Sequence, residues 1–126
     1  MLTQGEETVA KVIVNAAYVV HKTFGPGLLE NIYEVCLCHE LEKAGFKVNR
    51  QIYVPVNYDG LTLEAAFRLD ILVQDLVICE IKAVDIMHPI YEAQLLTYLK
   101  LSGKRLGFLI NFNVNLIKDG IKRMVL

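Results

Sequence analysis

Three charged residues interrupt two apolar runs between Leu69 and Lys82. Asp70 lies in the first run, and Glu80 and Lys82 lie in the second. Strands this apolar are typically buried on both faces, where ionised groups are costly unless they are paired or bind a metal. Two carboxylates and an amine suit chemistry with a hard divalent cation such as Mg²⁺ or Mn²⁺, in which the lysine orients or activates a water.

The spacing of these residues sets a geometric condition. Glu80 and Lys82 are two positions apart, so on a strand they share one face. If a three-residue loop joins the two strands, Val73 faces Val77 and Asp70 falls opposite Glu80. A two-residue loop would shift the register by one residue and separate the carboxylates. The alternative to a functional site is a structural ion pair of Lys82 with Asp70 or Glu80.

Composition limits the class of protein. The chain has 126 residues, 54% of them hydrophobic, and a net charge of −1. We expect one domain spanning residues 1–126. No apolar run approaches the roughly 18 residues that a membrane helix needs. The N-terminal residues do not resemble a signal peptide, and the odd number of cysteines suits reduced thiols, so we expect a cytoplasmic protein with no membrane association.

Periodicity and turn residues predict the order of the elements. Helices are expected over residues 6–21, 28–44 and 90–101, and strands over residues 46–58, 61–73, 76–84 and 106–112, followed by a tail with an apolar and basic run at residues 121–126. Pro55 indicates that the first strand lies at a sheet edge. This order predicts a mixed α/β domain with a late strand–helix–strand crossover.

The segment from Asp70 to Glu80-Ile81-Lys82 resembles the core motif of the PD-(D/E)xK nuclease superfamily. Leu69 stands where that motif has a proline, but this proline is often absent in the superfamily. Every other charged position of the core motif is filled.

Two further motifs strengthen the resemblance. Gly27, Glu30 and Tyr33 match the G-x-x-E-x-x-Y signature of a family of small proteins in this superfamily. Gln94 and Tyr98 resemble the Q-x-x-x-Y element of the RecB-like branch, and their spacing places them on one face of a helix. The three motifs occur in the family's order, and the resemblance covers nearly the whole chain.

The resemblance implies a PD-(D/E)xK (restriction-endonuclease-like) core, a mixed central sheet flanked by helices. It implies a nuclease that hydrolyses phosphodiester bonds with a divalent metal, in DNA rather than RNA. The alternative is a catalytically silent binding or adaptor module that keeps the nuclease fold. Tyr33 could simply be a core aromatic, which is the interpretation we favour for it.

The resemblance also assigns roles to the polar residues. Asp70 and Glu80 would bind the metal, with the main-chain carbonyl of Ile81 as a further ligand. Glu30 would complete the acidic set, directly or through water. Lys82 would position or activate the attacking water.

Residues on and beyond the third helix would contact the substrate. Gln94 would orient Lys82 or a phosphate. The contacts to nucleic acid are expected from Tyr98, Lys100, Lys104 and Arg105. With a net charge of −1 these basic residues could equally be ordinary solvated surface, and a homodimer could pool two weak patches.

Overall fold

The computed structural model describes residues 1–126 as one five-stranded sheet with helices on both faces. The elements are α1 (Gln4–Phe24), α2 (Glu30–Lys43), β1 (Val48–Tyr58), β2 (Leu61–Val73), β3 (Val77–Lys82), α3 (Ile90–Ser102), β4 (Leu106–Asn111), the short 3₁₀ helix η1 (Ile117–Asp119) and β5 (Ile121–Val125). The strand order is β1-β2-β3-β4-β5, and only β3 and β4 run parallel. This is the mixed α/β fold that the sequence predicted.

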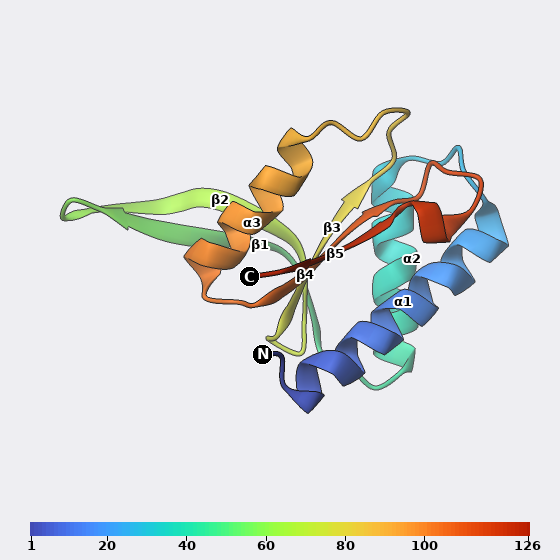
Figure 1. Cartoon of the computed structure of the whole chain (residues 1–126), viewed down its shortest axis with the longest axis horizontal. Helices are drawn as coiled ribbons and strands as arrows, with labels where there is room; N and C mark the ends of the chain where they lie inside the picture. The colour runs from blue at the N-terminus through green and yellow to red at the C-terminus, as the bar shows by residue number, and fades with distance from the viewer.

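Two helical layers of unequal size cover the sheet. Helices α1 and α2 lie on one face and α3 lies on the other (Figure 1). The first face buries a cluster of 20 apolar residues and the second a cluster of seven. Strands β3 and β4 are the most deeply buried strands, as a parallel pair covered on both faces should be. Charged residues of β3 therefore lie in the interior of the domain.

The register of β2 on β3 is the one that the three-residue loop requires. Val73 pairs with Val77, and Ile71 pairs with Cys79. Gln74 and Asp75 turn the chain with left-handed φ angles of 54° and 56°. The structure has the three-residue loop, one of the two alternatives that the sequence left open, and Asp70 is brought opposite Glu80.

The remaining differences from the predicted elements are at their ends. Helix α1 begins earlier than expected because Thr3 and Glu6 form a reciprocal capping box. The tail run forms β5, an edge strand beside β4, where a run without a strand assignment was expected. Pro55 does lie in an edge strand, at an irregularity in the β1–β2 pairing.

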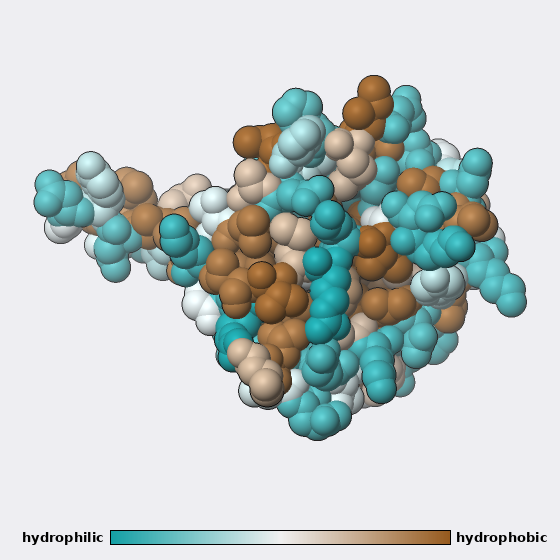
Figure 2. Space-filling model, viewed as in Figure 1, coloured by the Kyte–Doolittle hydropathy of each residue, from teal (hydrophilic) through white to brown (hydrophobic).

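The ends of β1 and β2 that meet at the Asp59-Gly60 turn extend well beyond the sheet. Figure 1 shows this hairpin as an arm that no helix covers, and Figure 2 shows apolar and polar side chains mixed along it. Tyr58 and Leu61 near its tip are 69% and 62% exposed. No helix in the structure is both long enough and apolar enough to span a bilayer.

Candidate metal centre

The acidic pair lies where β2 and β3 separate. The pairing of β2 with β3 ends at Ile71 and Cys79. Beyond this point, the two strands are joined by hydrogen bonds from main-chain N–H groups to the two carboxylates. The Asp70 N–H donates to Glu80 Oε2 at 2.9 Å, and the Ile81 N–H donates to Asp70 Oδ2 at 2.8 Å. Each carboxylate thus bonds the other strand's main chain. This exchange fixes both groups in the gap between the strands.

Burial and the closeness of the two carboxyls disfavour full ionisation of the pair. Burial and the nearby Asp70 carboxylate raise the pKa of Glu80 to about 8, and the hydrogen bond to Asp70 N–H and the charge of Lys82 only partly oppose this. Burial also raises the pKa of Asp70, against the hydrogen bond from Ile81. No salt bridge reaches either carboxylate. Neither Asp70 nor Glu80 therefore has a cationic side chain bonded to it.

Lys82 lies near the pair without bonding it. Its Nζ lies 4.4 Å from the centroid of the Tyr91 ring on α3, a cation–π contact. The structural ion pair considered from the sequence is therefore absent, although the Lys82 charge lowers the pKa of both Asp70 and Glu80. A lysine in a cation–π contact keeps its three N–H donors free to bond a water or a ligand.

Glu30 is the first residue of α2 and lies at the margin of the pair. Partial burial raises its pKa, Lys82 lowers it, and Asp70 raises it. The buried Tyr33 fixes this end of the helix, because its hydroxyl donates to the Gly25 carbonyl at 2.6 Å and accepts from the Leu28 N–H at 3.0 Å. Tyr33 is thus the core aromatic we expected, and it positions Glu30.

A second acidic residue of α2 was not singled out from the sequence. Glu34 is 3% exposed and accepts hydrogen bonds from Arg50 Nε and Nη2, at 3.1 and 2.6 Å, and from Gln51 Nε2 at 2.9 Å. Its charge raises the pKa of Asp70 and of Glu80. The signal in the sequence was its position one helical turn after Glu30.

Residues of α3 lie close to the acidic pair and to Lys82. Tyr98 stacks on Phe67 of β2, with ring centroids 4.5 Å apart. Burial raises the pKa of Tyr98, and so do the charges of Glu80 and Asp70, which lie close by. Gln94, one turn earlier, is exposed and makes no hydrogen bond to Lys82.

The basic residues that follow Tyr98 lie towards the other end of the sheet. Lys104 precedes β4 and forms an ion pair of 3.3 Å with Asp75, in the turn between β2 and β3. Arg105 is half-buried and its carbonyl accepts from the last residue of the chain, while Lys100 on α3 is exposed. These residues are not gathered around the acidic pair.

The donor set decides whether a metal fits. No three Asp, Glu, His or Cys side chains come close enough together to hold an ion by themselves. Asp70 and Glu80 nevertheless offer uncompensated carboxylate oxygens, the ligands that Mg²⁺ prefers, and Mg²⁺ usually retains several waters beside one or two carboxylates. The pair therefore fits a hydrated divalent cation, and no third carboxylate comes close enough to be a direct ligand.

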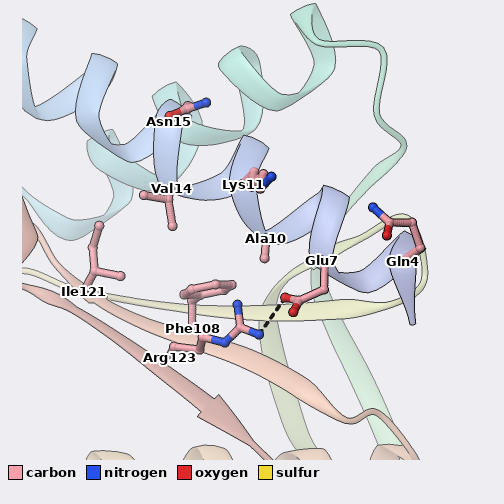
Figure 3. A pocket seen from close by; sticks show the side chains of 9 residues that line it. All are labelled: Gln4, Glu7, Ala10, Lys11, Val14, Asn15, Phe108, Ile121 and Arg123. Atoms are coloured by element: carbon pink, nitrogen blue, oxygen red, sulfur yellow. Dashed lines mark hydrogen bonds and ion pairs between the residues drawn. The ribbon is translucent and has the colours of Figure 1, made fainter. Parts of the chain in front are cut away.

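The largest hollow in the molecule is elsewhere. It lies between α1 and the strands β4 and β5, has a volume of about 680 Å³, and is crossed by an ion pair of 2.6 Å between Glu7 and Arg123 (Figure 3). Apolar side chains such as Phe108 and Val14 form its floor and wall (Figure 3). It shares no residue with the acidic pair, and its one acidic group is already paired.

Comparison with known proteins agrees with the fold. A family model described as the PD-(D/E)XK nuclease superfamily matches residues 7–124. No curated protein and no solved structure matches the chain. Nucleases of this superfamily generally use divalent metals, which suits the oxygen donors described above. The chain belongs to the PD-(D/E)XK nuclease superfamily.

Proposed function

We propose that this domain is a nuclease that hydrolyses phosphodiester bonds with Mg²⁺ or Mn²⁺, acting on DNA in preference to RNA. The observation that supports it is the uncompensated pair of Asp70 and Glu80 in the gap between β2 and β3, with Lys82 beside it. Two neighbouring carboxyls whose pKa values are both raised by burial are typical of functional sites.

Each residue has a role that its position supports. Asp70 and Glu80, with the Ile81 carbonyl, hold the cation, and Glu30 holds its waters. Lys82 leaves the Tyr91 ring to orient the attacking water or to stabilise negative charge on the phosphate. A bound divalent cation supplies a water of lowered pKa and neutralises charge that develops during in-line displacement.

The substrate lies along α3 in this proposal. Gln94 is exposed one turn before Tyr98 and reaches a phosphate rather than Lys82. Tyr98 contacts the strand, and Lys100, Lys104 and Arg105 add weaker contacts to the backbone. Within the superfamily, the spacing of Glu30 and Tyr33 and of Gln94 and Tyr98 supports the GxxExxY family and the RecB-like branch.

Cleavage assays on plasmid, single-stranded and branched DNA test this function, each with Mn²⁺, with Mg²⁺ and with EDTA. We expect cleavage by the wild type with metal only. Asp70→Asn and Glu80→Gln should each reduce it by more than about 100-fold, because ligand loss exceeds the effect of losing an outer-shell partner. Lys82→Met should reduce it by about 100-fold or more.

Glu64→Gln is the matched control, since it removes an exposed carboxylate on β2, six residues before Asp70. It should cleave as the wild type does. Intact DNA of all three forms after incubation with wild type and Mn²⁺ would contradict the proposal.

A second function is a binding or adaptor module that keeps the nuclease fold. Two observations favour it: no third carboxylate completes the acidic pair, and the β1–β2 arm exposes Tyr58 and Leu61. Such a module would leave DNA intact, and Lys82→Met would change nothing. Retained DNA binding without cleavage in EDTA and in Mn²⁺ would favour this second function.

A further inference from the structure

Gln51 has an unusual backbone for a residue in the middle of a strand. Its φ is 53°, in the left-handed region that favours glycine. The residues on either side pair regularly with β2, Arg50 with Ile71 and Ile52 with Leu69, so Gln51 falls opposite Asp70. Strain of this kind persists only where the surrounding structure enforces it, and it is concentrated at functional sites.

The strained backbone redirects the Gln51 side chain. Neighbouring residues of a strand point to opposite faces, yet Arg50 and Gln51 both bond Glu34 on α2. Gln51 Nε2 lies 2.9 Å from each Glu34 oxygen. A carboxylate only accepts hydrogen bonds, so the amide group must face Glu34 with its nitrogen, and the orientation of the amide is settled.

This orientation leaves Gln51 Oε1 turned away from Glu34. It is the one buried side-chain nitrogen or oxygen in the structure that has no hydrogen-bond partner. Buried polar atoms are nearly always bonded, so an exception requires an explanation.

No donor in the chain bonds Gln51 Oε1, although Arg68 lies near enough to Asp70 for its charge to lower the Asp70 pKa. Asp70 lies opposite it and, with Glu80, is close enough to Glu34 for the charge of Glu34 to raise both pKa values. Arg50 is engaged by Glu34, and Lys82 lies over Tyr91. A hydrated cation would bring both the missing positive charge and O–H donors.

We infer that Gln51 is a positioning residue of the metal centre, whose Oε1 accepts a hydrogen bond from a water in the cation's hydration shell. The inference rests on the proposed function, because it requires the cation that Asp70 and Glu80 bind. Glu34 and Arg50 hold the amide in place, and the left-handed backbone brings it there. Gln51 therefore links the α2 cluster to the acidic pair.

The test is calorimetric titration of Mn²⁺ into the full chain, with thermal unfolding in EDTA as a second measurement. Gln51→Gly removes the amide from a backbone that glycine adopts without strain. We expect Mn²⁺ affinity to fall about 10-fold or more, as for other outer-shell partners, while the melting temperature in EDTA reports separately the lost bonds to Glu34 and the relieved backbone strain.

Gln74→Gly is the matched control, because Gln74 has the same left-handed φ, 54°, but lies in the exposed β2–β3 turn. It should bind Mn²⁺ as the wild type does. Asparagine also adopts a left-handed φ, and its side chain is one methylene shorter, so the amide of Gln51→Asn lies farther from the metal centre. This variant should fold and show the same loss of affinity.

Two results separate failure of this inference from failure of the proposed function. Wild-type affinity in Gln51→Gly, with or without a lower melting temperature, would show that Gln51 only supports Glu34 and would overturn the inference alone. Absence of Mn²⁺ binding by the wild type would overturn the proposed function, and the role of Gln51 with it.

Discussion

Glu34 on α2 lies close to the pair of Asp70 and Glu80, but only Glu34 forms a salt bridge within the chain. Glu34 is enclosed by Arg50 and Gln51, which satisfy both of its oxygens. Asp70 and Glu80 accept one main-chain N–H each and pair with no cation. Burial, and then repulsion from Asp70, raises the pKa of Glu80 to about 8.

The difference indicates what each group does. A carboxylate that is fully paired within the chain adds rigidity and has no free capacity for a ligand. A pair without a cationic partner is costly to the metal-free fold, and a cost of this kind is typical of functional sites. Loss of a charge should therefore lower the stability of the protein at Glu34 and raise it at the pair of Asp70 and Glu80.

The largest effect on stability is expected when Glu34 loses its cation. Arg50→Met should destabilise the protein by about 3 kcal/mol, because it leaves a buried carboxylate without its positive partner. Urea unfolding in EDTA measures this. Lys43→Met is the control, since Lys43 forms an exposed pair with Glu40, and it should cost less than about 0.5 kcal/mol. Equal losses in the two variants would contradict the contrast.

The pH dependence of stability should show the uncompensated pair. A carboxyl whose pKa is raised by folding stabilises the protein below its ordinary pKa of 4.5 and loses that contribution as the pH rises through the folded value, about 8 for Glu80. In EDTA, the free energy of unfolding should therefore fall by roughly 3 kcal/mol between pH 5 and pH 8. Unfolding curves across this range measure the slope, and a flat profile would contradict it.

Removing one charge of the pair should stabilise the metal-free protein. Glu80→Gln keeps an oxygen for the Asp70 N–H and ends the repulsion, so we expect a gain of about 1 kcal/mol at pH 8 in EDTA and a flatter pH profile. The comparable change on α2, Glu34→Gln, should destabilise because it weakens the bonds to Arg50. Destabilisation by both changes would remove the distinction between the groups.

The smallest effect is expected at the contact that holds Lys82. Tyr91→Leu keeps apolar packing and removes the aromatic ring, so stability should change by no more than about 1 kcal/mol. Differential scanning calorimetry suffices to measure it. A much larger loss would mean that the Lys82–Tyr91 contact is primarily structural.

Much of the fold followed from local patterns in the sequence. The position of Asp70 opposite Glu80 depended on the length of one loop, which the sequence left open, and the structure has the three-residue loop that this position requires. The edge position of β1 followed from Pro55, which cannot donate a main-chain hydrogen bond. β5 was missed because its apolar and basic residues show too little alternation to indicate a strand.

The site was less predictable than the fold, because its parts come together through tertiary contacts. Nothing local indicates that Gln51 adopts a left-handed φ, since no glycine marks the position and Glu34 on a distant helix enforces it. Whether Lys82 contacts a carboxylate or the Tyr91 ring also depends on how α3 packs on the sheet. Residue types indicated the chemistry, whereas the supporting contacts required the structure.

Calorimetric titration of Mn²⁺ tests most directly whether Asp70 and Glu80 bind a divalent cation. We expect saturable binding at one site in the wild type at pH 7.5, weakened more than about 100-fold in Asp70→Asn. The Glu64→Gln control should bind as the wild type does. No saturable binding by the wild type, or undiminished binding by Asp70→Asn, would contradict the claim.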